Sequence, residues 1–135
     1  MAHVFMLDSD TYELERLSDG TSSMIVRGSH EMPSLYQNLK QGDKLYFTRD
    51  NQEGEIEALG LVSTVMISGS LTEEESYEII IRNQDKLQLP DDQFYKWAGK
   101  PYLILITLAL VRAIHLNLAE PDEDLPFLIP QPQAK

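Results

Sequence analysis

The pattern of apolar and polar positions predicts most of the strands. Short runs rich in β-branched and aromatic residues are typical of strands, and they occur at His3–Leu7, Ser23–Arg27 and Lys44–Arg49. A polar loop that ends in glycine, residues 50–54, separates the last run from a longer one at Glu55–Ile67. This order predicts a β-hairpin, and Gly60 inside its second strand indicates a bulge or a tight bend.

The clearest helix is predicted from its first turn. Thr72 and Glu75 have the spacing of a capping box, in which each side chain accepts a hydrogen bond from the other's backbone. Three consecutive glutamates also favour the positive end of a helix dipole. An apolar stripe at helical spacing then follows, made of Tyr77, Ile80, Ile81 and Leu87, so we expect a helix over residues 72–87.

Two shorter helices are predicted from similar signals. Asp10 and Glu13 have capping-box spacing ahead of a short amphipathic segment, which should end at Gly20 because glycine favours the left-handed position after a helix. Pro90-Asp-Asp92 should begin another helix, which carries Trp97.

A long apolar run, Leu103–Ile114, lies late in the chain. The preceding Gly99-Lys-Pro101 and the aliphatic composition favour a central strand covered on both faces, although a buried helix stays open as the alternative. The run is about half as long as a helix that spans a bilayer, so no membrane partner is expected.

These elements together predict the fold class. The strands come early and late and are joined by a hairpin, which argues against a doubly wound parallel sheet. We expect one α+β domain over residues 1–119, with a small mixed β-barrel of about five or six strands and three flanking helices. The composition of residues 120–135 predicts an acidic, proline-rich tail or strap. Its apolar run, Phe127-Leu-Ile129, would dock on the domain's own sheet or on a partner chain.

Composition narrows the functional classes. The chain has no cysteine, which excludes a disulfide framework, thiolate metal sites and cysteine nucleophiles. Together with a start that lacks the basic region of a signal peptide, this favours a cytoplasmic location. The net charge of −11 disfavours binding to a phosphate backbone. A small basic cleft assembled from Arg27, Lys44, Arg49 and Lys100 nevertheless stays open.

Two stretches resemble a known superfamily. Gly20-Thr-Ser-Ser-Met-Ile-Val-Arg27 is similar to the Gly-x-Lys-Thr-x-x-x-Arg segment that opens ASCH domains of the PUA-like superfamily. Gln41-Gly-Asp-Lys-Leu-Tyr-Phe47 resembles the superfamily's Gly-Asp turn into a strand, and Ile56–Val62 is similar to a strand seen in ASCH and EVE domains. The resemblance covers roughly residues 10–115 and implies a PUA-like barrel.

The same resemblance implies two activities, and the chain departs from both. ASCH proteins that act as amidohydrolases on acetylated nucleosides use the lysine of the first motif, whose place here falls on Ser22, while Ser23 falls on the threonine. A serine cannot replace an ammonium group without an activating base. RNA is a partner implied by the superfamily, but the acidic charge disfavours it.

Arg27 is the first candidate for a ligand contact, because a guanidinium at a strand end can hold a carboxylate, a phosphate or a base edge through two hydrogen bonds. The alternative is an ion pair with Asp43 or Glu31 that pins the loop. Five further residues complete the predicted ligand-binding set: Ser22 and Ser23 as hydroxyl donors, Tyr46 and Arg49 on the next strand, and Trp97 as a stacking wall. Core packing is the alternative for Trp97.

The leading hypothesis is therefore a non-catalytic PUA-like binding module for a small polar or nucleotide-like ligand near Gly20–Arg27. An ASCH-type amidohydrolase with an altered active site and an acidic protein-interaction domain are the alternatives. The three histidines lack metal-ligand spacing, and no phosphate loop or dinucleotide motif is present, so neither a metal nor a cofactor is expected. The sequence leaves the oligomeric state open.

Overall fold

In the computed structural model, the described residues are 2–9, 11–32, 38–49, 55–117 and 128–129. They form six strands and four helices. In chain order these are β1 (Ala2–Leu7), α1 (Glu13–Ser18), β2 (Met24–Ser29), β3 (Lys44–Arg49), β4 (Glu55–Ile67), α2 (Glu73–Arg82), α3 (Gln84–Leu87), α4 (Asp91–Trp97), β5 (Tyr102–Asn117) and β6 (Leu128–Ile129).

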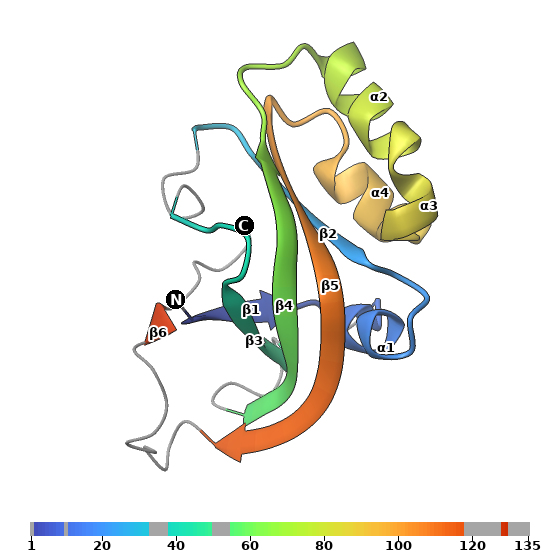
Figure 1. Cartoon of the computed structure of the whole chain (residues 1–135). Coiled ribbons are helices and arrows are strands. Elements are labelled where there is room, and N and C mark those ends of the chain that lie inside the picture. The colour runs from blue at the N-terminus through green and yellow to red at the C-terminus, as the bar shows by residue number, and fades with distance from the viewer. Residues whose placement is uncertain (1, 10, 33–37, 50–54, 118–127, 130–135) are drawn as a thin grey trace.

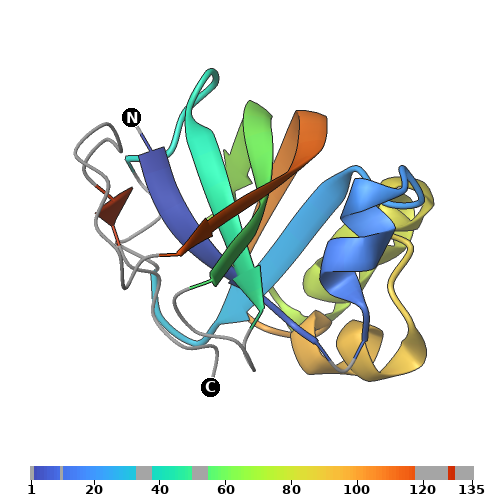
Figure 2. The ribbon, with the colours of Figure 1, turned by 90° about the horizontal axis from the view of Figure 1, so that it is seen from below.

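The strands form one mixed sheet in the order β2-β5-β4-β3-β1-β6. β1 is parallel to β3 and β6, and the other neighbours are antiparallel. The long strands β4 and β5 bend strongly, so the sheet curls into a half-barrel (Figures 1 and 2). The fold is thus the predicted α+β arrangement around a small curved mixed sheet.

Bulges produce the curl. Three register shifts interrupt the pairing of β4 with β5, and two of them lie on either side of Val62. Gly60 contributes in another way, because its backbone lies under the Phe47 ring and a Cβ at this position would be 2.7 Å from that ring. The predicted bend near Gly60 is present, and the glycine itself allows the close approach of an aromatic side chain.

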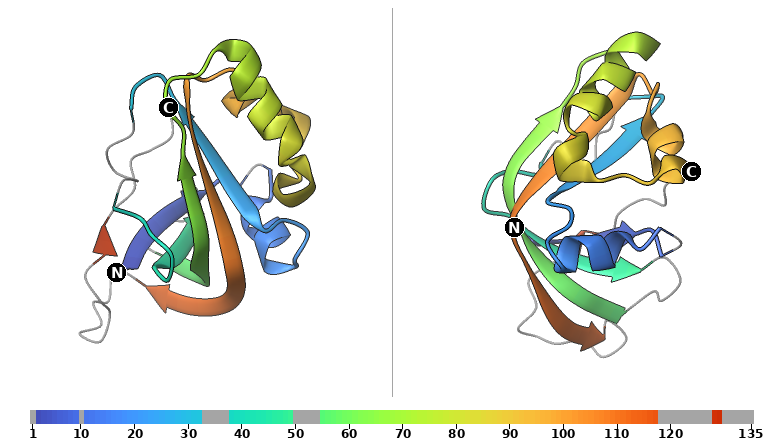
Figure 3. Two further views of the ribbon diagram at one scale, coloured as in Figure 1. Left: turned by 45° about the horizontal axis from the view of Figure 1, so that its top comes forward. Right: turned by 90° about the vertical axis from the view of Figure 1, so that its right-hand side faces the viewer.

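Two hydrophobic clusters lie on opposite faces of the sheet. The first is enclosed by the curl and by α1, and it includes Phe5, Leu14, Ile25, Phe47 and Ile106. The second lies between the first halves of β2 and β5 and the layer of α2, α3 and α4 (Figure 3). Its members include Val26, Ile80, Leu87, Trp97 and Leu103.

β5 is shared by both clusters, and it corrects one prediction. Leu103, Ile104, Leu105 and Ile106 are all buried, as expected of a strand covered on both faces. Leu110 is 55 % exposed, so the second half of the strand is not covered on both faces within the described residues. The reason is that the helical layer packs only against the first half of β5, the half that pairs with β2.

The helices confirm one capping box and correct the other. The Thr72 hydroxyl accepts a hydrogen bond from the Glu75 amide and the Glu75 carboxylate accepts one from the Thr72 amide, as predicted. The helix expected over residues 72–87 is divided at Asn83 into α2 and α3, which raises the number of helices from three to four. At α1 the N-cap is Tyr12 and has no side-chain cap.

Two residues of the apolar run in the predicted tail, Leu128 and Ile129, form a strand of the domain's own sheet. β6 pairs in parallel with the start of β1, with Ala2 opposite Leu128 and His3 opposite Ile129. The predicted hairpin loop 50–54, residues 118–119 and the rest of the tail, residues 120–127 and 130–135, lie outside the described residues. Within those residues, no helix is long and apolar enough to cross a membrane.

Candidate functional site

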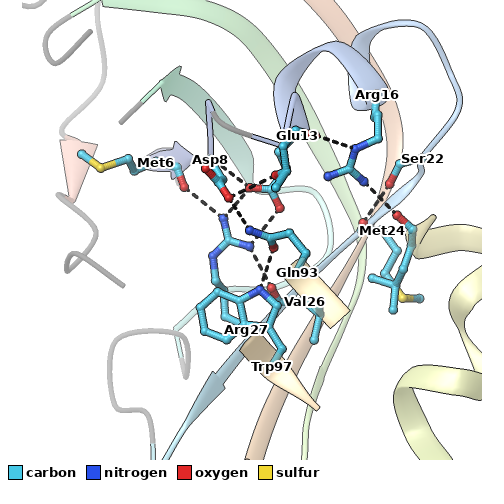
Figure 4. Close-up of polar contacts among 12 residues, drawn as sticks. Met6, Asp8, Glu13, Arg16, Ser22, Met24, Val26, Arg27, Gln93 and Trp97 are labelled. Atoms are coloured by element: carbon cyan, nitrogen blue, oxygen red, sulfur yellow. Dashed lines mark hydrogen bonds and ion pairs between the residues drawn. The ribbon is translucent and has the colours of Figure 1, made fainter. Parts of the chain in front are cut away.

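Arg27 lies near the end of β2 and is 8 % exposed. Its guanidinium donates two hydrogen bonds to Glu13, from Nη1 to Oε2 at 3.0 Å and from Nη2 to Oε1 at 2.9 Å. It also donates to the backbone oxygens of Met6 and Val26 (Figure 4). An ion pair was the sequence-based alternative, but the predicted partners, Asp43 and Glu31, were wrong. Asp43 instead contacts His3 and the Lys40 amide.

Glu13 is placed for this pairing by the start of α1. Its carboxylate also accepts a hydrogen bond from the Asp8 amide. The glutamate of the predicted capping box therefore does bind a backbone amide ahead of the helix, but that of Asp8 and not that of Asp10. One carboxylate therefore closes the loop between β1 and α1 and holds the guanidinium from β2. Because both charges are buried, loss of either partner would leave an uncompensated charge in the interior.

Trp97 meets Arg27 from α4. The Arg27 guanidinium carbon lies 5.4 Å from the centroid of the indole ring and 4.9 Å from that of Phe5. The Trp97 Nε1–H donates to Gln93 at 2.8 Å, and the Gln93 side-chain amide donates to Asp8 (Figure 4). Two predicted site residues, Arg27 and Trp97, are thus brought together by one polar network, although Trp97 is only 3 % exposed.

The two serines lie at the other end of β2. The Ser22 hydroxyl is buried, 3.1 Å from the backbone oxygens of both Met24 and Lys86. The Ser23 amide donates to the same Lys86 oxygen, while its side chain is exposed. Together they attach the start of β2 to the end of α3, and the Ser22 hydroxyl is engaged by the backbone.

Tyr46 and Arg49 lie on β3, which β4 and β5 separate from β2 in the sheet. Tyr46 is buried in a small cluster with Ile56, on the opposite face from Phe47, as the predicted alternation requires. Arg49 donates to Glu15 at 2.7 Å and to Glu57 at 2.5 Å. These hydrogen bonds, first that of Glu15 and then that of Glu57, raise the pKa of Arg49 above its ordinary value.

Basic side chains gather beside Trp97 at the end of β2. The Lys96 ammonium lies 4.9 Å from the centroid of the indole ring. The stem of Lys100 lies over Gly28, where an added Cβ would be 2.7 Å from Lys100 Cγ and 3.3 Å from the Trp97 ring. The Lys100 ammonium is 3.1 Å from Nε2 of the exposed His30. We call His30, Lys96 and Lys100 the basic cluster.

The basic cluster differs from the cleft considered from sequence. Lys100 does approach the Arg27 end of β2, but Lys44 and Arg49 are at opposite ends of β3. Within the described part of the chain, neither Lys96 nor Lys100 forms an ion pair with a carboxylate. The lysines therefore keep ammonium donors for a ligand, whereas Arg27 and Arg49 have carboxylate partners.

Sequence reasoning missed Asp8, Glu13 and Gln93 as partners of the predicted residues, and His30 and Lys96 as members of the basic cluster. The available signals were weak. Lys96 adjoins Trp97, and His30 follows β2, but only the packing of α4 against β2 brings these two positions together. No group of side chains suited to a metal ion occurs among the described residues.

Comparisons with known proteins identify the fold. No family model matches the chain, and no curated protein matches it. Among solved structures, the ASCH protein from Zymomonas mobilis aligns with a TM-score of 0.63 at 12% sequence identity, covering 88% of this chain and 75% of that chain. Two crystal structures of single-substitution variants of that protein align with TM-scores of 0.62 and 0.63 at 12% and 10% identity. The chain therefore has the ASCH, PUA-like fold predicted from its sequence.

Proposed function

We propose that this PUA-like domain is a non-catalytic binding module for a small anionic, nucleotide-like ligand. The ligand would bind at the basic cluster, beside Trp97 and at the Arg27 end of the Gly20–Arg27 segment. The observation that carries this proposal is the presence of two lysines without carboxylate partners around one indole ring, in a chain with a net charge of −11. In an acidic protein, such a cluster is where an anion is most favourably held.

The geometry supports two kinds of contact. Lys96, Lys100 and His30 can donate hydrogen bonds to phosphate or carboxylate oxygens. The existing Lys100–His30 hydrogen bond keeps the two side chains close together, so that one anion could bridge both. Arg27, which is itself held by Glu13, contacts the Trp97 ring and would fix its position. Arg27 and Glu13 would therefore be positioning residues.

The arrangement around Ser22 supports the non-catalytic part of the proposal. Its hydroxyl contacts backbone oxygens, and among the described residues it has no hydrogen bond to an ionisable side chain. A serine nucleophile needs a neighbouring base. Incubation with acylated cytidines, followed by chromatography, tests this point, and release of the acyl group would contradict it.

The binding test is titration calorimetry at low ionic strength with inorganic phosphate, a nucleoside monophosphate and the matching nucleoside. We expect the monophosphate to bind. Lys100→Ala should lower the affinity for it about tenfold, which corresponds to the loss of one charge-assisted hydrogen bond. Higher salt should weaken it further. Phosphate alone would indicate an anion site without base recognition.

Lys44→Ala is the matched control, because Lys44 is an exposed lysine on β3. It removes the same charge from another part of the sheet. Equal effects of Lys44→Ala and Lys100→Ala, or no binding of any of the three compounds, would contradict the proposed site.

A further inference from the structure

Three aromatic side chains form a surface cluster on the helical layer. The ring centroids of Tyr77 on α2 and Phe94 on α4 are 6.0 Å apart, and those of Phe94 and Tyr95 are 5.4 Å apart. Tyr95 is 71 % exposed, and Ile81, one turn after Tyr77, is 60 % exposed. Large apolar groups exposed together are unusual on a protein surface and typically indicate a contact with a partner.

The core does not account for these side chains. α2 buries Ser76 and Ile80, and α4 buries Gln93 and Trp97. Tyr95 lies outside the hydrophobic clusters, while Tyr77 and Phe94 are only partly buried at the margin of the second. The exposed edge of the aromatic cluster is therefore not needed to cover the sheet.

Carboxylates border the same surface. Glu73 precedes Tyr77 by one helical turn, and Glu73 Cγ and the Tyr77 ring both approach Gly99. Asp91 and Asp92 precede Tyr95 by one turn of α4 and are exposed. In the described part of the chain, none of these three carboxylates forms an ion pair.

We infer that this acidic aromatic surface is a docking site for an extended, lysine-rich segment of another protein. The ammonium groups would lie over the exposed Tyr95 ring and against the carboxylates, while the aliphatic stems of the lysines would cover Ile81 and Tyr77. The charge of the whole chain, −11, would attract such a segment from a distance. A nucleic acid would be repelled by the same carboxylates, which favours a basic protein partner. This inference is independent of the ligand proposed for the basic cluster.

Fluorescence anisotropy of a labelled peptide with alternating lysine and glycine tests the docking site. We expect the native protein to bind it. Tyr95→Ser should weaken binding about threefold, the effect of losing one exposed cation–π contact. The double change Asp91→Asn and Asp92→Asn should weaken it by at least a similar factor and reduce its dependence on salt.

Asp19→Asn is the control for net charge, because Asp19 is exposed after the end of α1. It should leave peptide affinity nearly unchanged, as should Lys100→Ala, which affects only the basic cluster. NMR shifts induced by the peptide should concentrate in residues 73–81 and 91–95. Equal losses with Asp19→Asn and with Asp91→Asn and Asp92→Asn together, shifts spread over the whole surface, or no binding by the native protein would overturn the inference.

Discussion

The Glu13 carboxylate accepts hydrogen bonds from two directions, from the Asp8 amide and from the Arg27 guanidinium. At the scale of single residues, the Arg27–Glu13 contact is the one that sequence patterns could not predict. The spacing of Asp10 and Glu13 predicted a helix cap, which is a local property. The approach of Arg27 depends on how β2 returns beside α1, and that is a property of the tertiary fold.

Removal of the Arg27 charge should therefore destabilise the domain strongly. Arg27→Met leaves the buried Glu13 carboxylate without its cation, and loss of one partner of a buried ion pair typically costs about 3–5 kcal/mol. Urea unfolding measures the change. The double variant with Glu13→Leu should recover much of the loss, because no unpaired charge remains. A loss below about 1 kcal/mol for Arg27→Met would contradict this account.

A second prediction concerns Gly60. In Gly60→Ala the new methyl group would lie 2.7 Å from the Phe47 ring, which is fully buried and cannot move aside without disturbing its neighbours. We expect a loss of about 1–3 kcal/mol, the usual cost of overpacking. Gly69→Ala is the control, since nothing lies within 4 Å of the added group. Its effect should stay within about 0.5 kcal/mol.

At the scale of elements, the sequence predicted β3 and β4 to the residue, because β-branched and aromatic runs are bounded there by turns. It predicted α2 from its capping box. The division of residues 72–87 at Asn83 was not visible, since Ile80 and Leu87 are seven positions apart, a separation that also fits one face of a continuous helix. Of the candidate site, Arg27 and Trp97 do come together, but the basic cluster required the packing of α4 against β2.

The capping box of α2 should make stability depend on pH. Hydrogen bonds from Thr72, first from its backbone and then from its side chain, lower the pKa of Glu75 below its ordinary value. A carboxylate with a lowered pKa stabilises the fold above its ordinary pKa, and this stability disappears as the pH falls through the lowered value. Near neutral pH, the melting temperature of the native protein should therefore be higher than that of the Glu75→Gln variant.

The difference between the two proteins should shrink as the pH falls below the ordinary range of glutamate. Melting curves between about pH 7 and pH 3 measure it. Glu74→Gln is the control, because Glu74 lies in the same turn, and its charge also favours the helix start, but it does not cap Thr72. A constant difference at all pH values would show that the carboxylate charge of Glu75 is irrelevant to the cap.

At the scale of the whole molecule, the two larger hydrophobic clusters depend on β2 and β5. The helical layer should therefore not unfold separately from the curled sheet. Trp97 is the one tryptophan of the chain and lies in the second cluster, so its fluorescence reports on the helical layer. Circular dichroism reports mainly on the sheet and helices together. We expect the two urea transitions to coincide, as in a two-state domain. A separate, earlier fluorescence transition would indicate an independent helical layer.

The position of β5 has a consequence for synthesis on the ribosome. β2 pairs only with β5 among the described strands, with Met24 opposite Thr107, and Trp97 reaches Arg27 only after α4 has been made. A nascent chain that ends before Tyr102 consequently presents the apolar residues of β2 with no strand to receive them. Chaperone binding should be strongest during this interval, and it should end when β5 leaves the exit tunnel.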